Sequence, residues 1–323
     1  MNSDFIEQDQ SQQVRQLEEF SRLVLSEYGI QAQEITSINY EYNVTFKIVS
    51  LDGKCFALRI NINSPRSIEN IRGEIAWVKQ LCELGIVNVA KPICNLAGEY
   101  VTTKFSLIIG KELNCVLFGW VHGEDVGDEP SAEQLFLVGK SMALMHIMSR
   151  DFVLPKGAVL PSFKDPFWET EDLLLSIKSQ LKESDKSRIA AAFKKIGVTT
   201  DAMYRRENSL LIHADLHGWN LKWNAGVLSI LDFDDCGFGL RIQDIATALY
   251  YLDTPDQDEA LLSGYKSIAP LPIYSDEELR ALLLHRRLML LNYLYETDNK
   301  EHRAMIPTYL EETSKRIDKF LAI

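Results

Sequence analysis

The chain has 323 residues, of which 46% are hydrophobic and 25% are charged, and its net charge at pH 7 is −12. This composition is ordinary for a globular protein, and the length suits two domains better than one core. Both halves share the acidic excess and no basic stripe interrupts it, so we expect no nucleic-acid partner. No run of about 18 apolar residues is present, so we expect no membrane span.

The five cysteines are scattered, without a CxxC motif or the spacing of a zinc site. This pattern predicts reduced thiols and a cytoplasmic protein. The N-terminal stretch MNSDFIEQDQSQQ is polar and acidic, so we expect neither a signal peptide nor a mitochondrial presequence. No feature of the sequence predicts an oligomeric state.

The first 120 residues predict a small α+β unit. Apolar positions at helical spacing alternate with β-rich runs, and an Asp52-Gly53 pair between two such runs is typical of a hairpin turn. Gly85 fits the C-terminal end of a helix. The expected elements are a helix over 11–28, β-rich runs over 38–50 and 54–62, a helix over 67–84, and strands over 101–105 and 115–121.

The remaining residues predict a mostly helical unit with one small strand pair. Ser131 and Gln134 form a capping-box pattern at the start of a helix over 131–149. Further helices are expected over 170–182, 185–195, 244–252, 259–265, 276–295 and 304–321. The segment 121–125 is rich in Gly and acidic residues, so we predict a boundary there, with an N-terminal lobe over 1–121 and a C-terminal lobe over 122–323.

Polar side chains follow the two predicted strands of the second lobe. The apolar run 210–212 leads to His213, Asp215 and Asn220, and the apolar run 227–231 leads to Asp232. Carboxylate and amide oxygens are hard ligands of the kind that Mg²⁺ prefers. The order His-x-Asp-x4-Asn, strand, Asp is the order of a kinase catalytic loop and metal-binding Asp.

With the two lobes in place, HADLHGWN and ILDFDD resemble the catalytic motifs of the aminoglycoside phosphotransferase-like kinases. This superfamily includes choline kinases, homoserine kinases of the second type, methylthioribose kinases and bacterial stress-response Ser/Thr kinases. The stretch DFDDCGFGLRIQD is most similar to the homoserine-kinase and stress-response-kinase side. The resemblance implies a protein-kinase-like, bilobal α+β fold, with a small β-rich N-lobe and a larger helical C-lobe.

The resemblance also implies roles for the residues of the C-lobe. Asp215 matches the catalytic base, and Asn220 and Asp232 match the Mg²⁺ ligands. His213 and Asp244 match residues that support the loop. His217 and Asp234 are candidates for a phosphate or substrate contact, and Asp234 could also meet a second metal ion.

In the N-lobe, Arg59 of FALRI occupies the position of the kinase lysine, with Glu74 as its candidate partner. The phosphate-covering loop, residues 39–43, contains no glycine, so Asn43 is the candidate for a phosphate contact there. The backbone of Gly119 and Val121 is expected to bind the adenine edge. ATP with Mg²⁺ is the expected pair of cofactors, and GTP is not excluded.

The predicted function is phosphoryl transfer from ATP to a hydroxyl group of a homoserine-, choline-, sugar- or aminoglycoside-like small molecule. The acidic and aromatic stretch 250–259 can form a pocket for a cationic substrate, although a solvated loop is the preferred interpretation. One alternative function is a Ser/Thr protein kinase of the stress-response type. Another is a metal-dependent hydrolase that uses His213, Asp215 and His217 as ligands.

Overall fold

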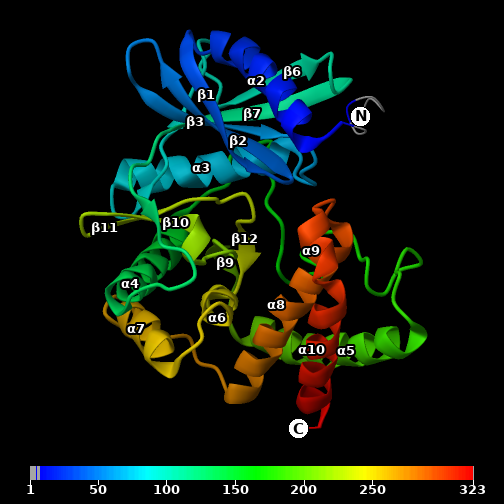
Figure 1. The fold of residues 1–323 in the computed structure, drawn as a ribbon. Coiled ribbons are helices and arrows are strands. Elements are labelled where there is room, and N and C mark those ends of the chain that lie inside the picture. The colour runs from blue at the N-terminus through cyan, green and yellow to red at the C-terminus, as the bar shows by residue number, and fades with distance from the viewer. Residues whose placement is uncertain (1–4, 6–7, 323) are drawn as a thin grey trace. The chain divides into compact units, whose positions relative to one another are not determined.

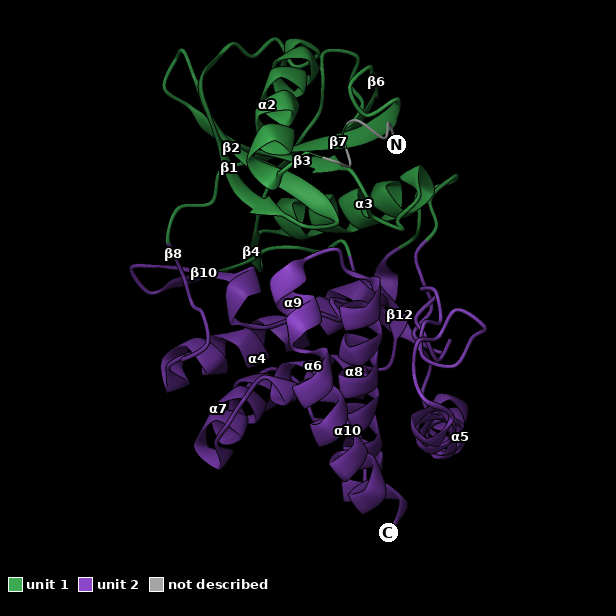
Figure 2. Cartoon of the chain, turned by 45° about the vertical axis from the view of Figure 1, so that its right-hand side comes forward, with its two compact units in different colours: residues 1–123, 153–159, 229–234 green, residues 124–152, 160–228, 235–323 purple. Residues whose placement is uncertain are grey.

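The computed structural model describes residue 5 and residues 8–322 and contains two compact units (Figure 2). Unit 1 comprises the chain up to Gly123 together with the segments Val153–Val159 and Ser229–Asp234, and unit 2 comprises the rest. The prediction divided the chain once, after Val121, and did not assign these two later segments to the N-terminal lobe. The N-terminal stretch in which no targeting sequence was expected includes residues 1–4 and 6–7, which lie outside the described residues.

Unit 1 is built around a sheet of six strands, in the order β1-β2-β3-β7-β5, with β6 also paired to β7 (Figure 1). Every pair in this sheet is antiparallel. A separate parallel pair joins β4 to β11, which enters the unit from residue 229 onward. The elements are α2 (Gln10–Ser26), β1 (Ala32–Tyr40), β2 (Asn43–Ser50), β3 (Cys55–Asn61), α3 (Ile68–Leu84), β4 (Asn88–Val89), β5 (Pro92–Ile93), β6 (Val101–Ser106), β7 (Lys111–Gly119) and β11 (Val227–Ile230).

Alternation along the strands gives this sheet two faces, and a separate apolar cluster lies on each of them. Phe46 of β2 and Leu58 of β3 lie in a core cluster that also includes Phe20 of α2, so α2 covers one of these faces. Val116 of β7 points to the other face and packs against Ile75 of α3. The predicted β-rich run over 38–50 is two strands in the structure, because the chain turns at residues 41–42 between β1 and β2.

Unit 2 is mostly helical, and its four short strands form two antiparallel pairs, β8 with β10 and β9 with β12. Helices α5, α8 and α10 share one apolar core. The predicted α+β class is therefore confirmed. No helix among the described residues is long and apolar enough to cross a membrane. The elements are β8 (Glu124–Asp125), α4 (Ala132–Met148), η1 (Ser149–Asp151), α5 (Glu183–Arg206), β9 (Leu210–Ile212), η2 (Gly218–Asn220), β10 (Leu221–Asn224), β12 (Gly237–Gly239), α6 (Arg241–Tyr250), α7 (Pro255–Lys266), α8 (Asp276–Glu296), α9 (Lys300–Ala304) and α10 (Ile306–Leu321).

The helix predicted over 170–182 is wrong, because this segment is irregular in the structure. Its backbone N–H groups bond to side chains instead of forming a helical ladder. Asp172 Oδ1 accepts the N–H groups of Leu174 and Leu175 at 2.9 and 2.7 Å, and Asn292 Oδ1 accepts that of Leu173 at 2.9 Å. Asp and Asn side chains commonly compete with helix formation in this way.

Candidate active site

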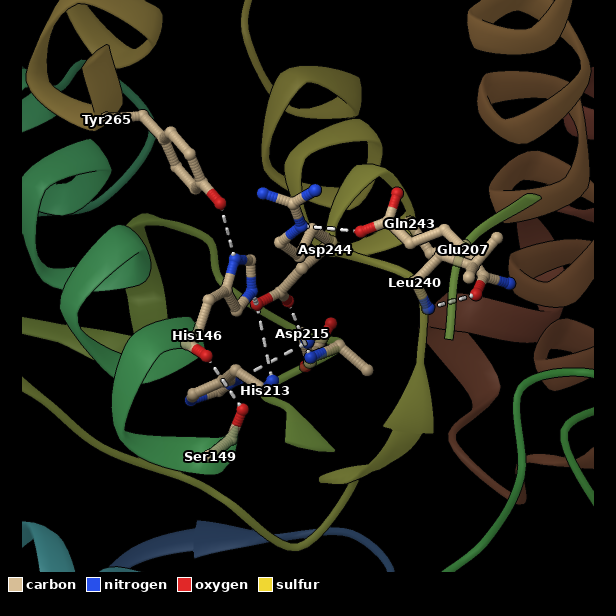
Figure 3. Close-up of polar contacts among 11 residues, drawn as sticks. His146, Ser149, Glu207, His213, Asp215, Leu240, Gln243, Asp244 and Tyr265 are labelled. Carbon is tan, nitrogen blue, oxygen red and sulfur yellow. Dashed lines mark hydrogen bonds and ion pairs between the residues drawn. The ribbon is translucent and has the colours of Figure 1, made fainter. Parts of the chain in front are cut away.

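The loop that follows β9 contains a strained residue that Asp244 stabilises. Ala214 has a φ of 68°, a left-handed conformation that is unfavourable for any residue with a Cβ. Asp244 Oδ1 accepts the N–H of Ala214 at 2.8 Å, and Oδ2 accepts that of His213 at 3.4 Å (Figure 3). These bonds hold the backbone on both sides of the His213–Ala214 peptide, directly before Asp215.

Asp244 is itself held in a buried network. His146 of α4 places Nε2 2.9 Å from Asp244 Oδ2 and Nδ1 3.0 Å from the hydroxyl of Tyr265 on α7 (Figure 3). Burial would raise the pKa of Asp244, but the hydrogen bonds from His146 and from the loop backbone keep it below its ordinary value. The carboxylate is therefore ionised and links α4, α6 and α7 to the loop.

The carboxylate of Asp215 has partners on both oxygens. Arg286 of α8 donates to Oδ1, and Asn220 donates from Nδ2 to Oδ2 at 3.1 Å. His217 Nε2 lies 3.4 Å from the same Oδ2. Burial would raise the pKa of Asp215, but Arg286 and then His217 lower it well below its ordinary value.

Arg286 is a buried cation that the sequence analysis did not identify. Its guanidinium also donates to the Tyr251 hydroxyl at 2.6 Å, and it lies over the rings of Trp168 and Tyr251 at 5.7 and 5.4 Å from their centroids. A buried guanidinium needs such partners, because an unpaired buried charge is strongly destabilising. The available signal was the Arg286-Arg287 pair inside the apolar run LLLHRRLMLL.

The turn after Asp215 is compact. Asn220 Nδ2 also donates to the backbone carbonyl of Asp215 at 2.9 Å, so the amide closes the loop through its Nδ2. His217 Nδ1 accepts the N–H of Trp219 at 3.3 Å. A Cβ on Gly218 would lie 1.7 Å from the carbonyl oxygen of Gly127, so only glycine fits at this position.

A cavity of about 330 Å³ adjoins this turn within unit 2. His217, Trp219 and Tyr251 contribute aromatic rings to its wall, and Asp128 and Asp253 contribute carboxylates. The rest of its lining is mainly apolar, and no Lys or Arg is among the described residues that line it. Of the acidic and aromatic stretch 250–259, only Tyr251, Leu252 and Asp253 line this cavity.

In unit 1, Arg59 and Glu74 form the predicted pair. Arg59 Nη1 donates to Glu74 Oε1 at 2.8 Å and Nη2 donates to Oε2, a bidentate arrangement that joins β3 to α3. Both side chains are buried. Burial would lower the pKa of Arg59, but the Glu74 carboxylate outweighs it and raises the pKa.

Asn43 and Asp234 also lie together in unit 1. Asn43 Nδ2 donates to Asp234 Oδ2 at 2.8 Å, and Arg66 Nε donates to the Asp234 carbonyl oxygen at 3.1 Å. Asp232, two residues earlier, has a φ of 58°. The carboxylates of Asp234 and Asp232 both raise the pKa of Arg59, so the segment that carries these two residues shares one electrostatic environment with β3.

Gly119 and Val121, the predicted adenine contacts, come at the end of β7 and just after it. The N–H of Gly119 donates to the carbonyl oxygen of Lys91 at 2.8 Å, and the N–H of Trp120 donates to the carbonyl oxygen of Cys55 at 3.3 Å.

The hydrolase alternative finds no support, because the described residues contain no group of three or more His, Cys, Asp or Glu that could hold a metal ion.

Residues 35–282 match the model of the phosphotransferase enzyme family, APH. Amicoumacin kinase of Bacillus subtilis (strain 168) is 26% identical over 238 residues, which cover 72% of this chain and 68% of that protein. An amicoumacin kinase solved in complex with AMP-PNP, Ca²⁺ and Ami aligns with a TM-score of 0.75 at 19% identity, covering 93% of each chain. A microcompartment-associated aminopropanol kinase aligns with a TM-score of 0.76 at 21% identity, covering 94% of this chain and 97% of that one.

These two structural similarities confirm the predicted kinase-like fold. The family match begins in β1, includes the loop with Asp215 and ends in α8, so it spans well over half of the chain. It confirms the resemblance seen in HADLHGWN and ILDFDD. The chain belongs to the phosphotransferase enzyme family and is a phosphotransferase.

Proposed function

We propose that this phosphotransferase transfers the γ-phosphoryl group of ATP, with Mg²⁺, to a hydroxyl group of a small molecule bound in unit 2. The observation that carries the proposal is Asp215, a carboxylate fixed by Arg286 and Asn220 and followed directly by residues that line a cavity of about 330 Å³. A cavity of this size lies within the range of small-molecule sites. The AMP-PNP in the related amicoumacin kinase supports ATP as the donor.

In this proposal, Asp215 orients the acceptor hydroxyl and receives its proton. Phosphoryl transfer passes through a loose transition state, so positioning contributes more than early proton removal. The lowered pKa of Asp215 fits this role, because it keeps the carboxylate ionised as a hydrogen-bond acceptor at neutral pH and makes it a weak base.

We assign Mg²⁺ to Asn220 and Asp232. Their donor atoms fit the ion: Asn220 uses Nδ2 toward Asp215 and keeps a neutral Oδ1, and Asp232 adds a carboxylate. Mg²⁺ takes few protein oxygens and completes its shell with phosphates and water. The ion supplies charge neutralisation at the β- and γ-phosphates.

The nucleotide is assigned to residues of unit 1. Arg59, oriented by Glu74, binds phosphate oxygens, and the backbone of Gly119 and Val121 binds the adenine edge. Asn43, Asp234 and His217 remain candidates for phosphate or substrate contacts. All five cysteines are free, which fits the reducing cytoplasm as the location.

The cavity favours an acceptor that carries both a hydroxyl and a cationic amine. Two carboxylates and the rings of Trp219 and Tyr251 line it, and this combination binds ammonium groups by charge and cation–π attraction. The name of the related aminopropanol kinase supports this class, because aminopropanol is an amino alcohol.

The test is an ADP-release assay with Mg·ATP and a panel of acceptors: amino alcohols, choline, homoserine, methylthioribose, aminoglycosides and a generic protein. We expect release that depends on an amine-bearing small molecule and disappears on chelation of Mg²⁺. Release that only the protein acceptor stimulates would contradict the small-molecule assignment. Hydrolysis that requires copurified zinc would contradict the phosphotransferase site itself.

A further inference from the structure

Three asparagines form a row across the face of the unit 1 sheet that lies opposite the core under α2. The strand register places Asn61 of β3 directly between Asn43 of β2 and Asn114 of β7. Side chains two residues apart on a strand share a face, so Asn61 lies on the same face as Arg59. The opposite face of these strands holds the apolar core.

Each outer asparagine has a hydrogen-bond partner on one side-chain atom, while Asn43 Oδ1 and both amide atoms of the central asparagine have none among the described residues. Asn114 Oδ1 accepts from the Thr103 hydroxyl at 2.8 Å, and Asn43 Nδ2 donates to Asp234 Oδ2 at 2.8 Å. Asn61 is only 8% exposed, and neither Nδ2 nor Oδ1 finds a partner among the described residues.

A buried amide without partners is unfavourable, because it has lost its bonds to water and gained none from protein. A leucine has nearly the same shape as asparagine and would avoid this cost in the middle of a sheet. The strand nevertheless carries Asn61. A ligand that bonds to the amide removes the cost, so the unpartnered amide points to a polar ligand on this face.

The donors and charged groups around Asn61 indicate the chemical class of this ligand. Arg59 Nε is also buried without a partner among the described residues, so a second N–H donor is available two positions from Asn61 on the same face. Two donors suit phosphate oxygens. The cluster nevertheless holds more carboxylates than cations, which favours a phosphate that carries a divalent cation over a bare anion. Its charged members are Arg59, Arg66, Glu74, Asp232 and Asp234.

We propose that Asn61 is a phosphate-binding residue, whose Nδ2 donates to a phosphate oxygen of the Mg²⁺-bound nucleotide beside Arg59. This inference rests on the proposed function. In protein kinases, a glycine-rich loop covers the phosphates. The β1–β2 turn of this chain, Glu41-Tyr42, has no glycine, and the side-chain amide of Asn61 supplies a donor from the sheet instead.

The experiment compares the full-length wild-type chain with Asn61→Leu and with the matched control Asn114→Leu, which removes an amide from the same row. Calorimetric titrations use adenosine, Mg·ADP and Mg·AMP-PNP, and thermal unfolding is followed without nucleotide. For Asn61→Leu we expect about tenfold or greater loss of Mg·AMP-PNP affinity, with adenosine affinity unchanged. Its nucleotide-free Tm should rise by roughly 2 °C, because the buried amide is gone.

Asn114→Leu should keep the wild-type affinity for Mg·AMP-PNP, and Asn61→Ala repeats the test should Asn61→Leu fail to fold. Wild-type Mg·AMP-PNP affinity in both Asn61 variants would overturn the inference and leave the proposed function intact. Equal losses for adenosine and Mg·AMP-PNP would also overturn it, because Asn61 would then act through the fold. A wild-type chain that binds no Mg-nucleotide would overturn the proposed function together with the inference.

Discussion

Asp215 accepts hydrogen bonds on both carboxylate oxygens within unit 2, from Arg286 and from Asn220. Replacing it with Asn keeps the shape but removes the negative charge and the proton acceptor. We expect Asp215→Asn to lower kcat by about 10²–10⁴-fold, the usual contribution of a positioned acid–base group. Mg-nucleotide affinity should stay at the wild-type value in calorimetry, and the surface variant Asp201→Asn should change neither quantity. Full turnover by Asp215→Asn would rule out its role as base.

Arg286 is the main charge that lowers the pKa of Asp215. The pKa of Asp215 is depressed, so the carboxylate is ionised above that pKa and loses its charge as pH falls through it. In Arg286→Met, burial remains while the main opposing charge is gone, so the pKa of Asp215 should rise. The acidic limb of the kcat/KM profile should therefore move to higher pH. An acidic limb at the wild-type pH would show that Arg286 acts on activity only through packing.

A substitution at Asp232 tests whether nucleotide binding depends on the metal ion. As a proposed Mg²⁺ ligand, it should matter for nucleotide binding only when the ion is present. We expect Asp232→Asn to lose about tenfold or more in affinity for Mg·AMP-PNP, with little change for AMP-PNP in EDTA. A Mg²⁺ titration followed by calorimetry checks this. An unchanged Mg²⁺ dependence in Asp232→Asn would remove Asp232 from the metal site.

The sequence predicted the members of the candidate site that are close to one another along the chain. Asp215, His217 and Asn220 are in contact in the structure, as their spacing suggested. Arg286 and His146 were missed, because their contacts with Asp215 and Asp244 join residues 71 and 98 positions apart. Such contacts depend on how helices pack, and helical periodicity alone does not show which buried polar residues will meet.

At the scale of elements, α4 and α7 cross at two glycines. A Cβ on Gly139 would lie 1.9 Å from the carbonyl oxygen of Leu261, and a Cβ on Gly264 would lie 1.9 Å from that of Phe136. The helices can approach this closely only without side chains at these positions. The same two helices carry His146 and Tyr265, so their close contact fixes the network behind Asp244.

We therefore expect Gly139→Ala to destabilise the chain by about 1–3 kcal/mol, the usual cost of overpacking, and to lower kcat by moving Tyr265 away from His146. Gly197→Ala is the control. Gly197 lies within α5, and apart from the adjoining helix backbone and chain neighbours no atom lies within 4 Å of the added methyl group, so alanine should stabilise the helix by up to about 1 kcal/mol. Thermal unfolding measures the stability of both variants, and ADP release measures their kcat. Equal Tm changes in the two variants would show that the close approach of α4 and α7 is not the cause of the destabilisation.

The elements that the sequence predicted best have local stop signals. The helix expected over 67–84 ends at Gly85, which has a φ of 62° and closes α3 as predicted. The segment 170–182 has apolar spacing but was mispredicted, because Asn292 on a distant helix takes one of its backbone N–H groups. Strands β10 and β12 were missed for a similar reason, since each is at most four residues long and depends on its partner strand.

At the scale of the whole molecule, unit 1 is discontinuous along the chain. Its segment Ser229–Asp234 supplies Ser229 and Ile230, the half of β11 that pairs with β4, and Asp234, which bonds to Asn43 and Arg66. A fragment that ends at Gly123 keeps the Arg59–Glu74 pair but loses these contacts. The lobe boundary expected from the sequence, after Val121, would produce such a fragment.

We expect the fragment 1–123 to unfold at a lower urea concentration than a version that carries residues 227–234 on a long Gly/Ser linker. The added strand restores the pairing of Ser229 with Asn88 and of Ile230 with Val89, and Asp234 again accepts from Asn43 and Arg66. The linker itself orders nothing, so any gain comes from the added residues. The version with Asp234→Ala should recover only part of the gain. Identical urea midpoints for all three fragments would mean that the sheet and its two helices account for the stability of unit 1. The segment 227–234 would then contribute nothing to that stability.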